Sequence, residues 1–176
     1  MKIDYLIIGQ GLAGSLLSLA LIEKGYQVMV IDDNHQSAAT KFAAGVINPI
    51  TGKRLVRTWN NDTHHDQSIS HYIELEKQFK TKCLHNHALV RFLRSDIEKD
   101  AFSKKQTDPN YSAHLNQIIQ PKQFTDHFTD AETGFVLPSV YQLDTPTFLK
   151  SAKQKLIANN AYLNTPFQYS DILEKD

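Results

Sequence analysis

The sequence lacks two features that would narrow its class at once: cysteine pairs and an excess of charge. Cys83 is the single cysteine among 176 residues, which excludes an internal disulfide and favours a reducing compartment. A lone cysteine is most often a small buried hydrophobic residue. Basic and acidic residues number 19 each, so the formal net charge is zero. Without a basic block, nothing favours a nucleic-acid partner or an acidic membrane surface.

A hydrophobic run long enough to cross a bilayer is also absent. The most apolar stretch covers residues 11–22, whereas a membrane span needs about 20 apolar residues. Asp4 precedes this stretch and Glu23 and Lys24 follow it, with no small-residue cleavage site, so it does not match a secretory signal. We expect a buried helix here, in a cytoplasmic protein with no membrane partner.

Histidine is plentiful, with eight residues, but its spacing does not favour a metal site. His64 and His65 are adjacent on an expected helix and would point apart. A strand would align His85 with His87, but no third ligand accompanies them. We therefore expect no bound metal.

Only seven glycines occur in the chain, yet three of them fall in one motif, GQGLAG, directly after the apolar run from Ile3 to Ile8. Such a run is typical of a parallel strand covered on both faces. Gly9 permits a tight turn, Gly11 lets the backbone approach a pyrophosphate, and Gly14 lets the next helix pack close to the sheet. The motif predicts an α/β fold with a Rossmann-like βαβ unit and a parallel sheet.

The helix expected after this motif has its N-terminus at Leu12 and Ala13, where free N–H groups and the positive end of the helix dipole stabilise an anion. Gly25 ends the helix in the usual C-terminal glycine position. We expect the core to lie on one apolar stripe of the helix, formed by Ala13, Leu16, Leu17, Ala20 and Leu21.

A second strand, residues 27–31, leads directly to an acidic residue. In dinucleotide-binding folds, a carboxylate ~20 residues beyond the glycine motif accepts a hydrogen bond from a ribose hydroxyl. Asp32 lies close to that spacing. Asp33 is a second candidate for this role. Two carboxylates would repel a 2′-phosphate, which disfavours an NADP site.

A further stretch, TKFAAGVINP from Thr40 to Pro49, carries three small residues at Ala43, Ala44 and Gly45. Small residues suit a place where a ring system lies against backbone. Thr40 would begin a short helix whose N–H groups face a cofactor. The alternative is an ordinary Ala-Ala-Gly helix end.

The chain resembles the N-terminal half of the D-amino-acid oxidase superfamily of FAD-dependent oxidoreductases, which includes glycine and sarcosine oxidases. The resemblance is carried by GQGLAG, by the acid at Asp32 and by T-x-x-A-A-G followed by a proline. Residues 134–156 are similar to the strand and helix that precede the return to the family's FAD domain. The resemblance implies FAD as cofactor, an amine or amino acid as substrate, and hydride transfer from the amine-bearing carbon to flavin N5. The cofactor-binding residues it implies are Gly9, Gly11, Leu12, Ala13, Gly14, Asp32, Asp33, Thr40, Ala43, Ala44 and Gly45.

Arg54 and Arg57 resemble the Arg-x-x-Arg of sarcosine-oxidase-like members, which lies near the flavin and the substrate carboxylate. Guanidinium forms a planar fork that matches a carboxylate. The pair stands further beyond Gly45 than in those members. A catalytic role for these arginines is therefore one hypothesis, and a solvated basic turn is the other.

The remaining segments alternate helical and strand patterns. The elements that we expect are a helix at 64–80, a strand at 87–93, a helix with a capping box of Ser95 and Glu98, a turn at 107–112, a strand at 134–143 with an edge or bend at Pro138, and a helix capped by Thr145.

These patterns divide the chain into three parts. We expect residues 1–80 to form the FAD-binding part, 81–143 a portion of an α+β substrate domain, and 144–176 a helix returning towards the FAD domain. In the family a later half adds strands to both sheets and most substrate-binding residues, so the chain looks truncated. For this chain alone we expect no turnover.

Three interpretations of function stay open at this point. The first is the FAD-binding portion of an amine or amino-acid oxidoreductase. The second is a non-catalytic nucleotide-binding half, either inert or completed by a second polypeptide. The third is an NAD-binding Rossmann protein.

Overall fold

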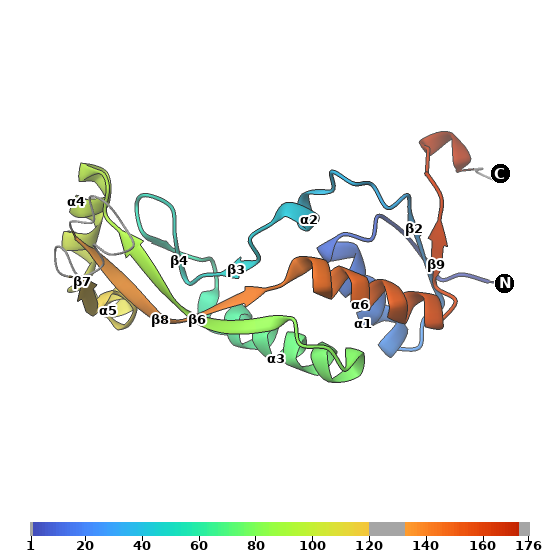
Figure 1. Ribbon diagram of the computed structural model, residues 1–176, viewed down its shortest axis with the longest axis horizontal. Coiled ribbons are helices and arrows are strands. Elements are labelled where there is room, and N and C mark those ends of the chain that lie inside the picture. Colours follow the sequence, from blue (N-terminus) through green and yellow to red (C-terminus); the bar gives the residue numbers. More distant parts are fainter. Residues whose placement is uncertain (1, 120–132, 173–176) are drawn as a thin grey trace. The chain divides into compact units, whose positions relative to one another are not determined.

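A computed structural model describes residues 2–119 and 133–172 (Figure 1). The contacts divide the chain into two units. Unit 1 comprises Met1–Gly45, Leu75–Cys83 and Leu143–Asp176, and unit 2 comprises Val46–Glu74 and Leu84–Gln142. By its contacts, the segment 46–74 belongs to unit 2, although the division predicted from the sequence grouped it with the FAD-binding part.

Unit 1 contains a parallel sheet with strand order β1 (Tyr5–Ile8), β2 (Val28–Asp32) and β9 (Tyr162–Asn164). Helices α1 (Leu12–Glu23) and α6 (Thr145–Ala158) pack against each other and against this sheet (Figure 1). The predicted α/β fold with a parallel sheet and flanking helices is confirmed.

The two faces of this sheet are covered unequally. Val28 and Val30 are buried on the face that carries the helices. Because paired residues of neighbouring strands share a face, Leu6, Ile8 and Leu163 lie together on the opposite one. Their exposed fractions are 52%, 48% and 48%, so the described residues leave this face largely open. The prediction that the first strand is covered on both faces is wrong for this part of the chain.

Helix α1 forms where the sequence predicted it, but a different side of it is buried. Ser15, Ser18 and Leu19 are its buried residues, whereas Leu17, on the predicted core stripe, is mostly exposed. The helix is apolar on most of its sides, so periodicity alone does not select a face. The buried Ser18 hydroxyl is satisfied because it donates to the Ser15 carbonyl at 2.9 Å.

Helix α6 is capped by Asp144 instead of the predicted Thr145. The Asp144 carboxylate accepts hydrogen bonds from the backbone N–H of Thr147 at 3.1 Å and from its hydroxyl at 2.7 Å. Both bonds satisfy groups of the first helical turn. The predicted core face of this helix is confirmed, since Phe148, Leu149, Ala152 and Leu156 are all buried.

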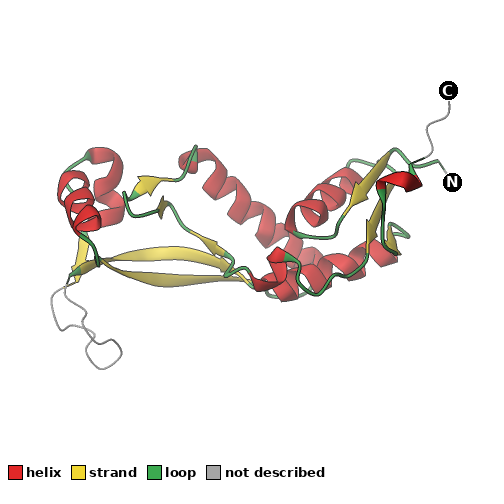
Figure 2. Ribbon diagram, turned by 90° about the horizontal axis from the view of Figure 1, so that it is seen from above, coloured by secondary structure: helices red, strands yellow, loops and turns green. Residues whose placement is uncertain are grey.

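Unit 2 contains a sheet in which β8 (Gly134–Leu143) lies between β3 (Val46–Ile47) and β6 (Leu84–Phe92), and β7 (Gln117–Ile119) also pairs with β8. Figure 2 shows β6 and β8 as two long neighbouring strands. Pro138 predicted either an edge strand or a bend, and the edge alternative is wrong because β8 has neighbours on both sides. Pro138 is tolerated because it lies between the residues that pair with β7, up to Val136, and those that pair with β3, from Tyr141 onwards.

The core of unit 2 is a closed apolar cluster. The rings of Phe102 and Phe135 stack with centroids 5.5 Å apart at its centre. The cluster also contains Ile50, Leu55, Leu93, Leu115, Leu137 and Val140. Around it lie the hairpin of β4 (Ile50–Thr51) and β5 (Val56–Arg57) and the helices α4 (Asp96–Lys105) and α5 (Pro109–Leu115).

Two helix starts in unit 2 test the sequence predictions. Ser95 caps α4 as predicted, accepting from the Glu98 N–H at 3.4 Å, but the Glu98 carboxylate bonds the Arg94 N–H in place of the Ser95 N–H. The turn predicted at 107–112 is confirmed only at its start, because the chain is helical from Pro109 and Asp108 caps α5 by accepting from the Asn110 N–H at 2.9 Å. Proline in the first turn then continues the helix instead of ending it.

Helix α3 (Asn61–Phe79) confirms the helix expected at 64–80 and begins three residues earlier. The short helix α2 (Ala39–Phe42) lies in unit 1. Within the described residues, no helix is both long enough and apolar enough to cross a membrane.

Candidate nucleotide-binding site

The turn between β1 and α1 explains two of the three glycines. Gly9 has a φ of +94°, a backbone conformation that L side chains rarely adopt, and its N–H donates to the Ile31 carbonyl at 2.7 Å. A Cβ on Gly14 would lie 2.0 Å from the Gly9 carbonyl oxygen. The helix start therefore packs directly on the turn, as the motif predicted.

Gln10, between the first two glycines, connects the turn to two helices through its side chain. Its side chain is buried, and its amide donates to the Ser15 hydroxyl at 2.9 Å and to the Leu149 carbonyl at 3.0 Å. The turn is thus fixed to both α1 and α6. No local pattern predicts this role, because the partner on α6 is 139 residues away.

Asp32, at the end of β2, is held against the same turn. Its Oδ2 accepts from the Gln10 N–H at 2.8 Å, and its Oδ1 accepts from the Asn34 N–H at 2.7 Å. The Tyr162 hydroxyl lies 3.4 Å from Oδ1. An ionised carboxylate has about four lone-pair sites, so Asp32 keeps capacity for a further donor such as a ribose hydroxyl. Asp33 instead accepts from the N–H of His35 at 3.0 Å.

The start of α1 offers N–H groups to an anion. Helix geometry leaves the first N–H groups without intrahelical acceptors. The Leu12 N–H donates to the Thr40 hydroxyl at 3.3 Å, which leaves the N–H groups of Ala13 and Gly14 as the donors of this first turn. Thr40 does not begin α2, because Ala38 occupies the cap position. Its hydroxyl joins the second predicted stretch to the glycine turn.

The Ala-Ala-Gly stretch has a structural explanation within the chain. Ala43 and Ala44 are exposed. Gly45 has a φ of +68°, and a Cβ there would lie 1.9 Å from the Leu143 carbonyl oxygen. The Leu143 N–H in turn donates to the Gly45 carbonyl at 2.9 Å. The close approach that requires glycine here is therefore to protein backbone.

A cavity of about 500 Å³ in unit 1 opens beside the glycine turn and Asp32. Of the predicted residues, Gly11 and Asp32 line it. The lining residues that the sequence reasoning missed are Gln10, Asn34, His35, Gln36, Ala38, Lys41, Phe42, Pro146, Leu149, Lys150 and Lys153. Three of the lining residues are lysines, which give the cavity a positive rim. Several of the missed residues lie on α6, and no local sequence pattern predicts that this helix packs beside the turn.

Two of these lysines also hold the walls of the cavity. Lys41 Nζ donates to the carbonyls of Asn34 and His35 at 3.2 Å and 2.8 Å, which fixes the loop after β2. Lys153 Nζ lies over the aromatic ring of Tyr162, 4.6 Å from its centroid. The loop and the end of the sheet are thus tied by cationic side chains.

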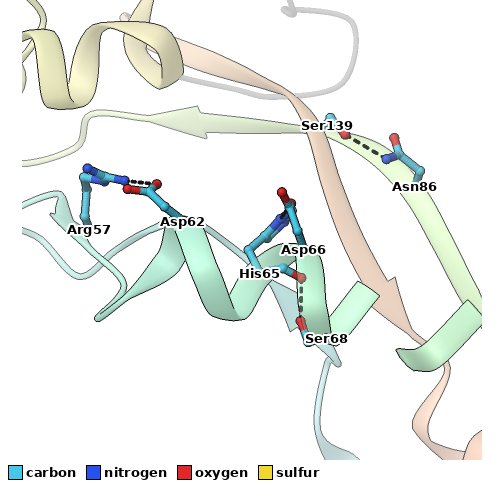
Figure 3. Close-up of polar contacts among 7 residues, drawn as sticks. All are labelled: Arg57, Asp62, His65, Asp66, Ser68, Asn86 and Ser139. Atoms are coloured by element: carbon cyan, nitrogen blue, oxygen red, sulfur yellow. Dashed lines mark hydrogen bonds and ion pairs between the residues drawn. The ribbon is translucent and has the colours of Figure 1, made fainter. Parts of the chain in front are cut away.

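The structure places Arg54 and Arg57 in different surroundings in unit 2. Arg54 is exposed in the turn of the β4–β5 hairpin. Arg57 is half-buried and forms an ion pair with Asp62, at the start of α3 (Figure 3). Its Nε is buried and has no hydrogen-bond partner among the described residues. Only Arg57 thus has an unused buried donor.

In the described parts of the chain, residues 2–119 and 133–172, no group of three or more His, Cys, Asp or Glu side chains is placed to hold a metal ion. His85 and His87 do align on β6, with ring centroids 6.0 Å apart.

The family model for FAD dependent oxidoreductases matches residues 4–168. The chain belongs to this family. The resemblance to the D-amino-acid oxidase superfamily is thereby confirmed, and the family is FAD-dependent. No match is found among curated proteins.

Three solved structures of family oxidases have the same fold. Glycine oxidase from Geobacillus kaustophilus has a TM-score of 0.69 at 15% identity, over 91% of this chain and 45% of its own. Glycine oxidase from Bacillus cereus has a TM-score of 0.66 at 16% identity, and the match covers 92% of this chain and 46% of that protein. Iminodiacetate oxidase from Chelativorans has a TM-score of 0.59 at 20% identity, and the match covers 92% of this chain and 46% of that protein. The family member described here spans about half the length of these proteins.

Proposed function

We propose that unit 1 binds FAD and that the chain supplies this portion of an oxidoreductase acting on amines or amino acids. The observation that carries the proposal is the position of Asp32, which the Gln10 N–H ties to the glycine turn beside the cavity. An acid in this position, next to a helix N-terminus, suits a ribose and a pyrophosphate.

The residues present fit such a group. The N–H groups of Ala13 and Gly14 would meet the pyrophosphate, and Asp32 would accept from a ribose hydroxyl. The lysines at the rim of the cavity would offset the negative charge of the phosphates. Phe42 and Leu149 supply apolar surface for the adenine ring. Asp33, Thr40, Ala43, Ala44 and Gly45 support this site through the loops in which they lie.

Bound FAD would accept a hydride from the carbon that bears the substrate amine, leaving an imine that hydrolyses. Arg57 is our candidate for the substrate carboxylate, because its buried Nε has no acceptor among the described residues. Arg54 is the weaker candidate, since its side chain is exposed in a hairpin turn.

A second candidate function is a nucleotide-binding half that another polypeptide completes. The open face of the unit 1 sheet, with Leu6, Ile8 and Leu163, favours it. The chain also spans only 45–46% of the three oxidases. In this proposal, turnover requires the portion that those oxidases carry beyond the match. The match to an FAD-dependent family weighs against an NAD-binding protein.

A titration of the purified chain with FAD, followed by flavin absorbance, tests the cofactor. We expect a bound-flavin spectrum, with affinity reduced about tenfold or more by Asp32→Ala and by Gly11→Val. Asp33→Ala is the matched control and should bind FAD as the unaltered chain does, because its carboxylate serves the local turn. Tighter binding of NAD than of FAD would contradict the proposal.

A further inference from the structure

A second hollow, of about 410 Å³, lies within unit 2 beside the start of α3. It belongs to a different unit from the nucleotide cavity and shares no lining residue with it. Its lining residues are Val46, Ile47, Asn48, Thr51, Thr58, Trp59, Asn61, His64, His65 and Ser68.

The lining contains no lysine, arginine, aspartate or glutamate. Its hydroxyl and amide groups are largely engaged within the protein. The Thr58 hydroxyl donates to the Asn48 carbonyl at 2.8 Å, and the Asn48 side-chain oxygen accepts from the Ile50 N–H at 3.0 Å. The Ser68 hydroxyl donates to the His65 carbonyl at 2.8 Å (Figure 3). A charged group placed in this hollow would find no counter-charge in its walls.

The two histidines of the lining are also engaged. His64 Nε2 lies 3.1 Å from the Asn60 side-chain amide, and His65 Nδ1 lies 3.0 Å from the Asp66 carboxylate (Figure 3). Each imidazole thus directs one nitrogen to a protein partner. What the hollow chiefly offers to a ligand is hydrocarbon and aromatic surface.

Trp59 is the largest aromatic side chain of the lining. It is the only tryptophan of the chain, and 82% of it is exposed. Its ring centroid lies 5.4 Å from that of His64, with the planes inclined by 44°. Covering an exposed indole with another ring is favourable, both through apolar burial and through ring–ring contact.

We propose that this hollow binds an uncharged aromatic ring that packs on Trp59, and that the ring is the side chain of an aromatic amine or amino-acid substrate. The statement that the hollow binds a ring depends only on the hollow. The statement that this ring belongs to the substrate rests on the proposed function. A flavin ring fits less well, because its polar edge needs several hydrogen-bond partners, whereas the hydroxyls of Thr58 and Ser68 and the side-chain oxygen of Asn48 are already engaged.

The experiment uses Trp59 emission from the full chain as the reporter, with acrylamide as a quencher of exposed tryptophan. We expect 2-phenylethylamine to lower the acrylamide quenching constant about twofold in a saturable manner, because the phenyl ring covers the indole. Ethylamine, which has the ammonium group but no ring, should leave the constant unchanged.

Two variants of α3 make the test site-specific. Ser68→Phe places a ring inside the hollow and should abolish protection by 2-phenylethylamine. Ser70→Phe, two residues further along the same helix and exposed, is the matched control and should keep it. If Ser68→Phe loses its far-ultraviolet circular dichroism, Ser68→Met fills the hollow with a more adaptable side chain.

Each outcome decides between the parts of the proposal. No protection by 2-phenylethylamine, or equal protection in Ser68→Phe, would overturn it. Protection by lumiflavin but not by 2-phenylethylamine would overturn the assignment to a substrate. The FAD titration follows flavin absorbance and is independent of Trp59 emission. Protection of Trp59 without any FAD binding would therefore contradict the proposed function but support the ring-binding site.

Discussion

Units 1 and 2 bury their apolar residues in different ways. In unit 2 the apolar side chains close on themselves around stacked Phe102 and Phe135, and Ile50 and Leu115 are fully buried. In unit 1 the sheet has helices on one face, while Leu6, Ile8 and Leu163 stand about half exposed on the other. A parallel sheet is normally covered on both faces. Among the described residues, this one face of the unit 1 sheet is therefore left largely open.

The largest expected effect contrasts a side chain of the closed core with one of the open face. Phe135→Ala should lower the free energy of unfolding by about 3–5 kcal/mol, because it leaves a cavity in a filled cluster. Leu6→Ala should lower it by less than about 1 kcal/mol, because Leu6 is already in contact with water. Urea titration measures both. Equal losses would mean that the open face is covered in solution.

The next effect concerns glycine in the two units. Gly14→Ala should cost about 3 kcal/mol and abolish FAD binding, because its Cβ would collide with the Gly9 carbonyl. Gly52→Ala, in the unit 2 hairpin, should cost only about 1–2 kcal/mol, because its φ is positive but nothing lies within 4 Å of the added Cβ. A Gly14→Ala chain that still binds FAD would contradict the close packing of helix on turn.

A smaller effect should be the same in both units. Asp144→Ala removes the cap of α6 in unit 1, and Ser95→Ala removes that of α4 in unit 2. Each should cost about 1 kcal/mol, the usual contribution of an N-cap side chain. Thermal unfolding followed by circular dichroism measures the losses. No loss of stability in Asp144→Ala would contradict its role as the cap of α6.

The smallest effect on stability at neutral pH concerns Cys83. Burial, reinforced by the carboxylates of Glu76 and Asp144, raises the pKa of its thiol to about 11. An unfolded thiol ionises near a pKa of about 8.5, so the unfolded chain releases a proton that the folded chain retains. The contribution of Cys83 to stability should be constant below a pH of about 8.5 and should be lost as the pH rises towards 11.

Thiol-reagent kinetics at neutral pH and urea titration at rising pH check this prediction. The reagent should modify Cys83 far more slowly in the folded chain than in urea. Cys83→Ala should lose this part of the alkaline fall in stability. Equal reaction rates in the folded and unfolded chains would show that the thiol is accessible.

The parts of unit 1 predicted from the sequence are those whose causes lie within about thirty residues. Gly9, Gly14 and Asp32 were assigned because strand, turn and helix follow one another directly in the chain. Gln10, Lys150 and Lys153 were missed because their roles depend on α6 packing beside the turn. The sequence indicates a need for small residues at Gly45, but spacing does not predict its backbone neighbour Leu143.

The bond from Gln10 to Leu149 also bears on the order of events during synthesis. The turn leaves the ribosome well before its anchor at Leu149, which is 139 residues further along the chain, and well before Tyr162, which lies beside Asp32. Contacts of such large sequence separation form late and slow folding. If unit 1 binds a nucleotide as proposed, the nucleotide would stabilise the turn only after α6 has been synthesised, so it would bind to an assembled unit 1 and would not guide its assembly.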